Sequence, residues 1–299
     1  MGRPRCLWLS ALFLLTRVAL AQTVVEDNRS VASDSPEGWA MRYFAGTTLM
    51  TSFGEAARLP PWRWNAAVDV GNIPRLSDAQ QRVAFGGSKS DDLNKSPVFG
   101  RLRLAVGLPD AWVAELGYTP PLEIAGSRAR NVFAMAIGRR VIEGDAMSLS
   151  LRALGQVGKV RGDITCPASV AGNPDPIVNP FDCRAPPSND TFTTNYYGVD
   201  ATIGWDAGAW KWFASAGIAR TELKVQVDAF IAESHDRSRV SLNTNLPWLT
   251  IGLRYAFDPR WSVAAELLYV PLDVRRAPDF SPTDDSLTSV RAQLRYSFD

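Results

Sequence analysis

The sequence predicts an all-β protein, an antiparallel up-and-down transmembrane β-barrel of about 10 strands, with a range of 8–12. From Trp62 onward the chain divides into segments in which polar and apolar side chains alternate, the pattern of a strand with two unlike faces. Each segment has about 10 residues, the length that a tilted strand needs to cross a bilayer. Short and long connections alternate between the segments, as they do in a barrel whose rims face different compartments.

The expected strands and connections follow the chain in a regular order. The strands cover residues 62–71, 97–108, 111–120, 130–140, 146–157, 195–205, 209–221, 247–257, 260–270 and 289–298. Short turns are expected at 109–110, 143–145, 206–208 and 258–259, and long connections at 72–96, 121–129, 158–194, 222–246 and 271–288. An even number of strands places both ends of the barrel at the rim with the short turns. Residues 39–53 and 80–86 could add strands, which leaves the count open by two.

One face of these strands is apolar, with aliphatic residues in the middle and aromatic residues at the margins. A water-soluble sandwich would have to bury this face, whereas a lipid band flanked by aromatic side chains accounts for both features. Six aromatic residues beside the short turns are expected to form a girdle at one rim: Trp112, Trp205, Trp210, Phe257, Trp261 and Phe298.

The opposite face carries charges, which the barrel would enclose. The expected luminal residues are Arg63, Asp69, Arg101, Arg103, Glu115, Arg152, Asp200, Lys211, Arg254, Glu266, Arg291 and Arg295. Folding the chain at its turns pairs Glu115 with Arg103, Asp200 with Arg152, and Glu266 with arginines on both neighbouring strands. Two interpretations stay open: a salt-bridge network that fills a closed barrel, and a narrow wet passage whose surplus positive charge favours small anionic solutes.

The last strand ends in LRYSF, in which an aromatic residue closes the strand. This ending resembles the barrel-assembly signal, and residues 62–298 resemble Gram-negative outer-membrane β-barrel proteins as a class. Asp299 after Phe298 departs from the signal. The resemblance implies a location in the outer membrane, with its lipid and the barrel-assembly machinery as partners. The function that fits is a non-enzymatic barrel, either a porin-like passage or a structural barrel.

Residues 1–21 are expected to be a secretory signal peptide, because Arg3 and Arg5 precede a short apolar run and a small-residue cleavage site. Its removal leaves 29 basic residues against 31 acidic ones, a balance that gives no reason to expect nucleic acid as a partner. Residues 22–61 form a separate periplasmic or plug segment, in which Ser35 is expected to cap a helix. The barrel domain covers 62–299, with long extracellular loops at 72–96, 158–194 and 222–246.

Cys166 and Cys183 lie in a stretch rich in Pro, Asn and Asp, and an exported chain is oxidised. We therefore expect a disulfide that closes the 158–194 loop. The spacing does not suit a metal site, and no cofactor is expected.

The rival functions are a surface enzyme and a binding surface. His235 is the one histidine, and the ten-stranded omptin proteases resemble this architecture in carrying Asp and His at an outer rim. His235-Asp236 and Asp91-Asp92 depart from the omptin spacing. Ser234 beside His235 could serve a lipid hydrolase, but it would point to the opposite side of an extended chain. Catalytic residues are therefore not assigned, and an adhesin built from the 158–194 and 222–246 loops is the other alternative.

Overall fold

The computed structural model describes residues 23–54 and 59–298. The expected signal peptide, residues 1–21, lies outside the described residues. No helix in this part of the chain is long and apolar enough to cross a membrane.

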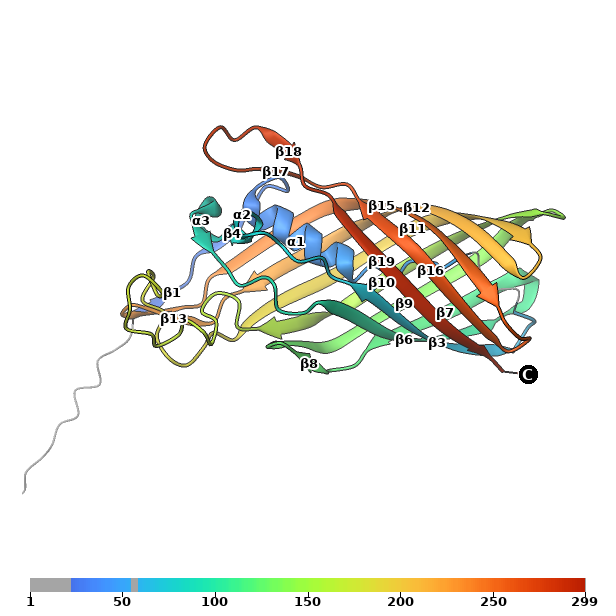
Figure 1. Cartoon of the computed structure of the whole chain (residues 1–299), viewed down its shortest axis with the longest axis horizontal. Coiled ribbons are helices and arrows are strands. Elements are labelled where there is room, and N and C mark those ends of the chain that lie inside the picture. The colour runs from blue at the N-terminus through green and yellow to red at the C-terminus, as the bar shows by residue number, and fades with distance from the viewer. Residues whose placement is uncertain (1–22, 55–58, 299) are drawn as a thin grey trace, which may run out of the picture.

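Ten antiparallel strands close into a barrel, and all ten expected segments are among them (Figure 1). Each strand pairs with the next, and the last pairs with the first. The strands are β3 (Trp64–Asn72), β6 (Val98–Gly107), β7 (Trp112–Thr119), β9 (Ser127–Glu143), β10 (Met147–Gly162), β11 (Asp190–Ala207), β12 (Trp210–Gln226), β15 (Arg239–Ala256), β16 (Trp261–Val270) and β19 (Leu287–Ser297). Both ends of the barrel chain lie at the rim with the short turns.

The barrel wall is tall on one side and low on the other. Strands β9, β10, β11, β12 and β15 have 16 to 18 residues. The remaining five have 8 to 11 residues. The tall strands extend past the expected boundaries because their pairing continues where the outer face turns polar, as at Lys159 and Arg161 of β10. The expected loops 158–194 and 222–246 therefore begin and end as strands.

Short helices and strands lie at the end of the barrel that carries the long connections. They are β1 (Thr23–Val25), β2 (Asn28–Ser30), α2 (Asp78–Gln81), β4 (Arg82–Val83), α3 (Ala84–Gly87), β5 (Lys89–Ser90), β8 (Glu123–Ile124), β13 (Ala229–Ile231), β14 (Ser234–Asp236), β17 (Asp273–Arg275) and β18 (Pro282–Asp284). A 3₁₀ turn, η1 (Pro109–Ala111), lies at the opposite rim. Strands β1 and β2 pair in parallel with β14 and β15, so the described chain starts at the end with the long connections.

Helix α1 (Pro36–Thr47) begins where the sequence predicts it. The hydroxyl of Ser35 accepts a hydrogen bond from the N–H of Gly38, and Pro36 occupies the first position of the helix. Trp39 and Tyr43 are buried in the apolar cluster that also contains the inner side chains of β15, β16 and β19. The indole N–H of Trp39 donates to the carbonyl of Asp285 at 2.8 Å. The alternative of an extra strand over 39–53 is wrong.

After α1 the chain continues down the inside of the barrel. Residues 48–53, here called the plug, are all buried although they form neither helix nor strand. Leu59 and Pro60 then lie against Gly107 at the short-turn rim. Helix α1 lies at the long-connection end of the barrel (Figure 1), residues 48–53 are buried below it, and Leu59 and Pro60 lie at the opposite rim.

Candidate functional site

Ten of the expected luminal charges face inward and form one cluster, here called the luminal network. They are Asp69, Arg101, Arg103, Glu115, Arg152, Asp200, Arg254, Glu266, Arg291 and Arg295, of which Glu115 and Arg295 are partly buried and the rest buried. Two expected members lie outside it. Arg63 precedes β3 and is exposed, because the chain leaves the extended conformation at Trp62. Lys211 lies at the rim, where it pairs with Asp206 at 2.8 Å.

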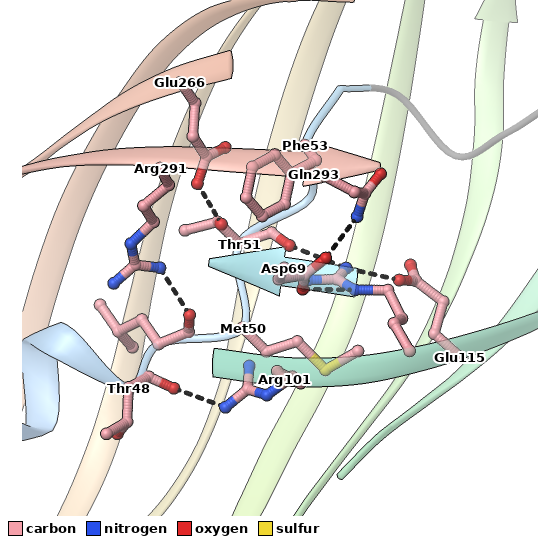
Figure 2. Close-up of polar contacts among 12 residues, drawn as sticks. Thr48, Met50, Thr51, Phe53, Asp69, Arg101, Glu115, Glu266, Arg291 and Gln293 are labelled. Carbon is pink, nitrogen blue, oxygen red and sulfur yellow. Dashed lines mark hydrogen bonds and ion pairs between the residues drawn. The ribbon is translucent and has the colours of Figure 1, made fainter. Parts of the chain in front are cut away.

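Arginines of the luminal network donate hydrogen bonds to the backbone carbonyls of the plug (Figure 2). Arg101 reaches Thr48 at 2.8 Å, Arg152 reaches Met50 at 2.6 Å, Arg103 reaches Thr51 at 3.0 Å, and Arg254 reaches Phe53 at 2.5 Å. Arg291 donates to Gly46, Thr47 and Leu49 at 2.9, 2.9 and 2.7 Å. Buried carbonyls of an irregular segment need donors, and these guanidinium groups take the place that a partner strand would fill.

The acidic residues of the luminal network, which also lie on the barrel wall, form ion pairs with the arginines. Asp69 accepts from Arg103 at 2.6 Å, and Glu115 lies between Arg103 at 2.8 Å and Arg152 at 3.2 Å. Asp200 accepts from Arg152 at 2.6 Å. The folding of the chain at its turns predicts the pairs of Glu115 and Asp200 correctly. The basic residues outnumber the acids, and the plug carbonyls accept much of the remaining donor capacity.

Glu266 faces Arg291 across the β16–β19 ladder, as expected, but its carboxylate accepts from the hydroxyl of Thr51 in the plug. Arg254 donates to Gln293 at 3.1 Å. The sequence pattern locates the charges on the wall but gives no sign that an N-terminal segment supplies their second set of partners.

Inward-facing glycines make room for the long guanidinium side chains. A Cβ at Gly117 would lie 2.8 Å from Cδ of Arg101, and a Cβ at Gly138 would lie 2.9 Å from Cγ of Arg152. Both distances are too short for real carbon atoms. The two arginines therefore lie flat against positions without side chains.

Above the plug lies a cavity of about 640 Å³, here called the apolar cavity. One face of α1 and the tall strands of the wall line it with apolar side chains, among them Phe44, Val132, Val160, Phe192, Val225 and Val240. Charged residues that line it include Glu37, Lys89, Asp91 and Lys95. Thr48 belongs to both the cavity lining and the plug, so the cavity floor rests on the luminal network. The sequence pattern gave no indication of this cavity.

Asp91 lies in the long connection between β3 and β6, beside the apolar cavity. Its carboxylate is paired with the buried ammonium group of Lys89. Burial raises the pKa of Asp91 to about 6, although the charge of Lys89 opposes the shift. This loop carboxyl is therefore expected to gain a proton in mildly acidic medium.

We expect the carboxyl of Asp91 to titrate near pH 6. Because its folded-state pKa lies above the ordinary value of 3.8, its contribution to stability is largest below about pH 4 and declines as the pH rises to about 6. Carbon-13 NMR of the side-chain carboxyls measures the midpoint, and the Asp91→Asn variant identifies the resonance. A midpoint at or below pH 4 would contradict the burial of this group.

The loop residues considered for catalysis are held within their own surroundings. His235 bonds Asp228 at 2.7 Å and stacks on Phe230 at a centroid distance of 4.3 Å. Asp92 pairs with Lys95 at 2.7 Å. These partners account for His235 and Asp92 as parts of the loop structure.

Cys166 and Cys183 form a disulfide in the connection between β10 and β11. Both are buried with Ala229 of β13, so the disulfide packs against the neighbouring excursion between β12 and β15. The carbonyl of Phe230 accepts from the N–H of Arg184 at 2.8 Å. The β10–β11 connection and the β12–β15 excursion therefore pack together at the end with the long connections.

The outer wall of the barrel is an exposed apolar band. Its short-turn margin carries exposed aromatic side chains at all six expected positions, Trp112, Trp205, Trp210, Phe257, Trp261 and Phe298. The other margin carries Phe133, Tyr197 and Tyr269, and beyond it charged residues such as Arg130 and Lys224 point outward. A closed ring of strands with an apolar belt between two aromatic girdles requires a lipid surrounding. The chain is an outer-membrane β-barrel.

Several solved structures are similar to this outer-membrane barrel, all at low sequence identity. No family model and no curated protein matches the chain. It is similar to the outer membrane protease OmpT from Escherichia coli, at 10% identity and a TM-score of 0.46, over 81% of this chain and 99% of that chain. It is also similar to the Pseudomonas putida toluene transporter TodX, at 13% identity and a TM-score of 0.33, over 92% of this chain and 85% of that one. It is similar to Neisserial surface protein A as well, at 10% identity and a TM-score of 0.31, over 79% of this chain and 97% of that one.

Proposed function

We propose that this outer-membrane barrel captures a small, uncharged apolar molecule in the apolar cavity, above a lumen that the plug closes to ions. The observation that carries the proposal is the cavity of about 640 Å³ between α1 and the tall wall. Binding sites for small molecules have volumes of roughly 300–1,000 Å³ and mainly apolar walls. Long connections of outer-membrane barrels face outward, so the cavity is on the external side.

The chemistry of the lining supports an apolar ligand. Val160, Phe192 and Val225 come from three adjacent tall strands, and Phe44 faces them from α1. The charged groups Glu37, Lys89, Asp91 and Lys95 have opposite signs, and Lys89 and Lys95 pair with neighbouring acids. An anionic ligand would therefore lose hydration without gaining an unpaired basic partner.

The alternative of a passage for small anionic solutes has less support. Its arginines face the lumen, but Arg101, Arg152 and Arg291 donate to carbonyls of the plug or of the last turn of α1. An anion would have to displace these hydrogen bonds. A surface enzyme has less support still, since among the described residues no hydroxyl or thiol group is hydrogen-bonded to His235 as a nucleophile would be.

Filling the cavity should abolish ligand binding. Val160 on β10 lines the cavity, whereas Val157 on the same strand is exposed on the outer wall. In lipid nanodiscs we expect Val160→Trp to weaken binding of the fluorescent apolar probe N-phenyl-1-naphthylamine by roughly tenfold or more. Val157→Trp is the matched control and should bind like the unchanged protein. Equal binding by both variants, or no binding above empty nanodiscs, would overturn the proposal.

A further inference from the structure

We infer that the apolar cavity opens sideways through the barrel wall between β6 and β7, so that its ligand enters from the outer leaflet of the membrane. The inference rests on the proposed function and names the route to that site. Three observations support it: a break in the strand ladder, a cavity lining that includes both faces of the wall, and the height of the break.

The ladder between β6 and β7 ends early. Its last pair toward the outside is Leu102 with Tyr118, although β6 extends outward to Val98. The residues that would pair next belong to Thr119-Pro120-Pro121. Proline has no N–H to donate to a ladder, so the two prolines end β7 and leave the first residues of β6 paired with β3 alone. We call this break the β6–β7 seam.

The cavity lining passes through the wall at the seam. Arg101 points into the lumen, so on the same strand Phe99 also faces inward while Val98 and Gly100 face outward. Val98, Phe99 and Gly100 nevertheless all line the cavity, as do Thr119 and Pro120 across the seam. Elsewhere on the wall the strand residues that line the cavity face inward, as Val132 and Val160 do, so a lining that includes Val98 and Gly100 points to a gap at the seam.

The seam lies at the outer boundary of the lipid band. Tyr118 is the last residue of β7 that pairs with β6. Its ring stacks on Phe133 of the outer aromatic girdle at a centroid distance of 5.0 Å. Immediately beyond it, Val98 and Leu122 are 45% and 65% exposed and also line the cavity. Exposed apolar side chains therefore flank the seam on the outer wall and also belong to the cavity lining. An apolar molecule held at the outer boundary of the leaflet would enter the site between them.

A bulky side chain at Gly100 tests the route, because this position lies at the seam on the outward-facing side of β6. A Cβ there would have the carbonyl oxygen of Asp69, at 3.9 Å, as its nearest neighbour, so the position accepts a side chain. Gly155 on β10 is the matched control, because it also faces outward but its ladder is paired on both sides. We expect Gly100→Trp to slow both the uptake of N-phenyl-1-naphthylamine from preloaded vesicles and its release into empty vesicles by roughly tenfold, because the probe passes the seam in both directions. A variant that only fills the site would release the probe faster than the unchanged protein does. Gly155→Trp should change neither rate.

A second variant closes the seam through the backbone. The double replacement Pro120→Thr and Pro121→Thr restores the missing N–H groups and should also slow uptake from vesicles. If the unchanged protein binds the probe and both seam variants load at its rate, the lateral route is wrong and the proposed function stands. If the unchanged protein does not bind the probe at all, the proposed function itself fails.

Discussion

Deletion of residues 23–53 is expected to turn a barrel that does not conduct ions into an anion-selective pore. The plug fills the lumen and accepts hydrogen bonds from Arg101, Arg103, Arg152 and Arg254. Without it these guanidinium groups would face water, and the basic residues of the luminal network outnumber its acids. Rings of basic side chains favour anions. In planar bilayers the intact chain should give no conductance steps, whereas the deletion variant should conduct and show an anion-selective reversal potential in a salt gradient.

A deletion of residues 277–281, in the hairpin between β17 and β18, is the control, since it removes chain far from the plug. Gel mobility of unboiled against boiled samples establishes that each variant is folded. A folded plug deletion that never conducts would mean that side chains of the wall fill the lumen by themselves. Conductance by the intact chain would mean that the plug leaves a path open.

Replacing Asp69 by Ala is expected to lower the free energy of unfolding by about 3–5 kcal/mol, the cost of breaking a buried ion pair from one side. Asp69 accepts from Arg103 at 2.6 Å and from Gln293 at 2.8 Å. Its loss leaves the buried guanidinium of Arg103 with less compensating charge. Urea unfolding of the barrel from lipid vesicles, followed by tryptophan fluorescence, measures the change.

Asp206→Ala is the matched control for Asp69→Ala. Asp206 also pairs with a basic residue, Lys211, but both side chains are about one-third exposed at the rim. Screening by water limits such pairs to about 1 kcal/mol or less. Similar losses for the two variants would show that burial does not set the strength of the luminal network.

Alternation alone was enough to predict the ten strands, because a barrel in lipid needs one apolar face along every strand. The same alternation placed Arg101, Arg152 and Arg291 on the inner wall. It set the strand ends too early, as at Val157 of β10, because pairing continues above the lipid band where the outer face turns polar. The cap at Ser35 was predictable because it depends on neighbours in sequence.

The plug and the apolar cavity could not be predicted from periodicity. Residues 48–53 have no regular pattern, and their burial depends on donors from strands far away in sequence. The cavity depends on where α1 lies against the wall, which leaves the side of Phe44 open and covers the side of Trp39. Such features come from how the segments combine, and no single segment carries their signature.

The path of the N-terminal segment constrains the order in which the molecule is assembled. The plug precedes β3 in the chain, and β3 pairs with β19, the last strand, to complete the ring. A helix is about 10 Å wide with its side chains, so α1 cannot readily be drawn through a finished lumen already crowded with arginines. We therefore expect the barrel to close around the N-terminal segment that it encloses, with the pairing of β3 and β19 as the last step of assembly.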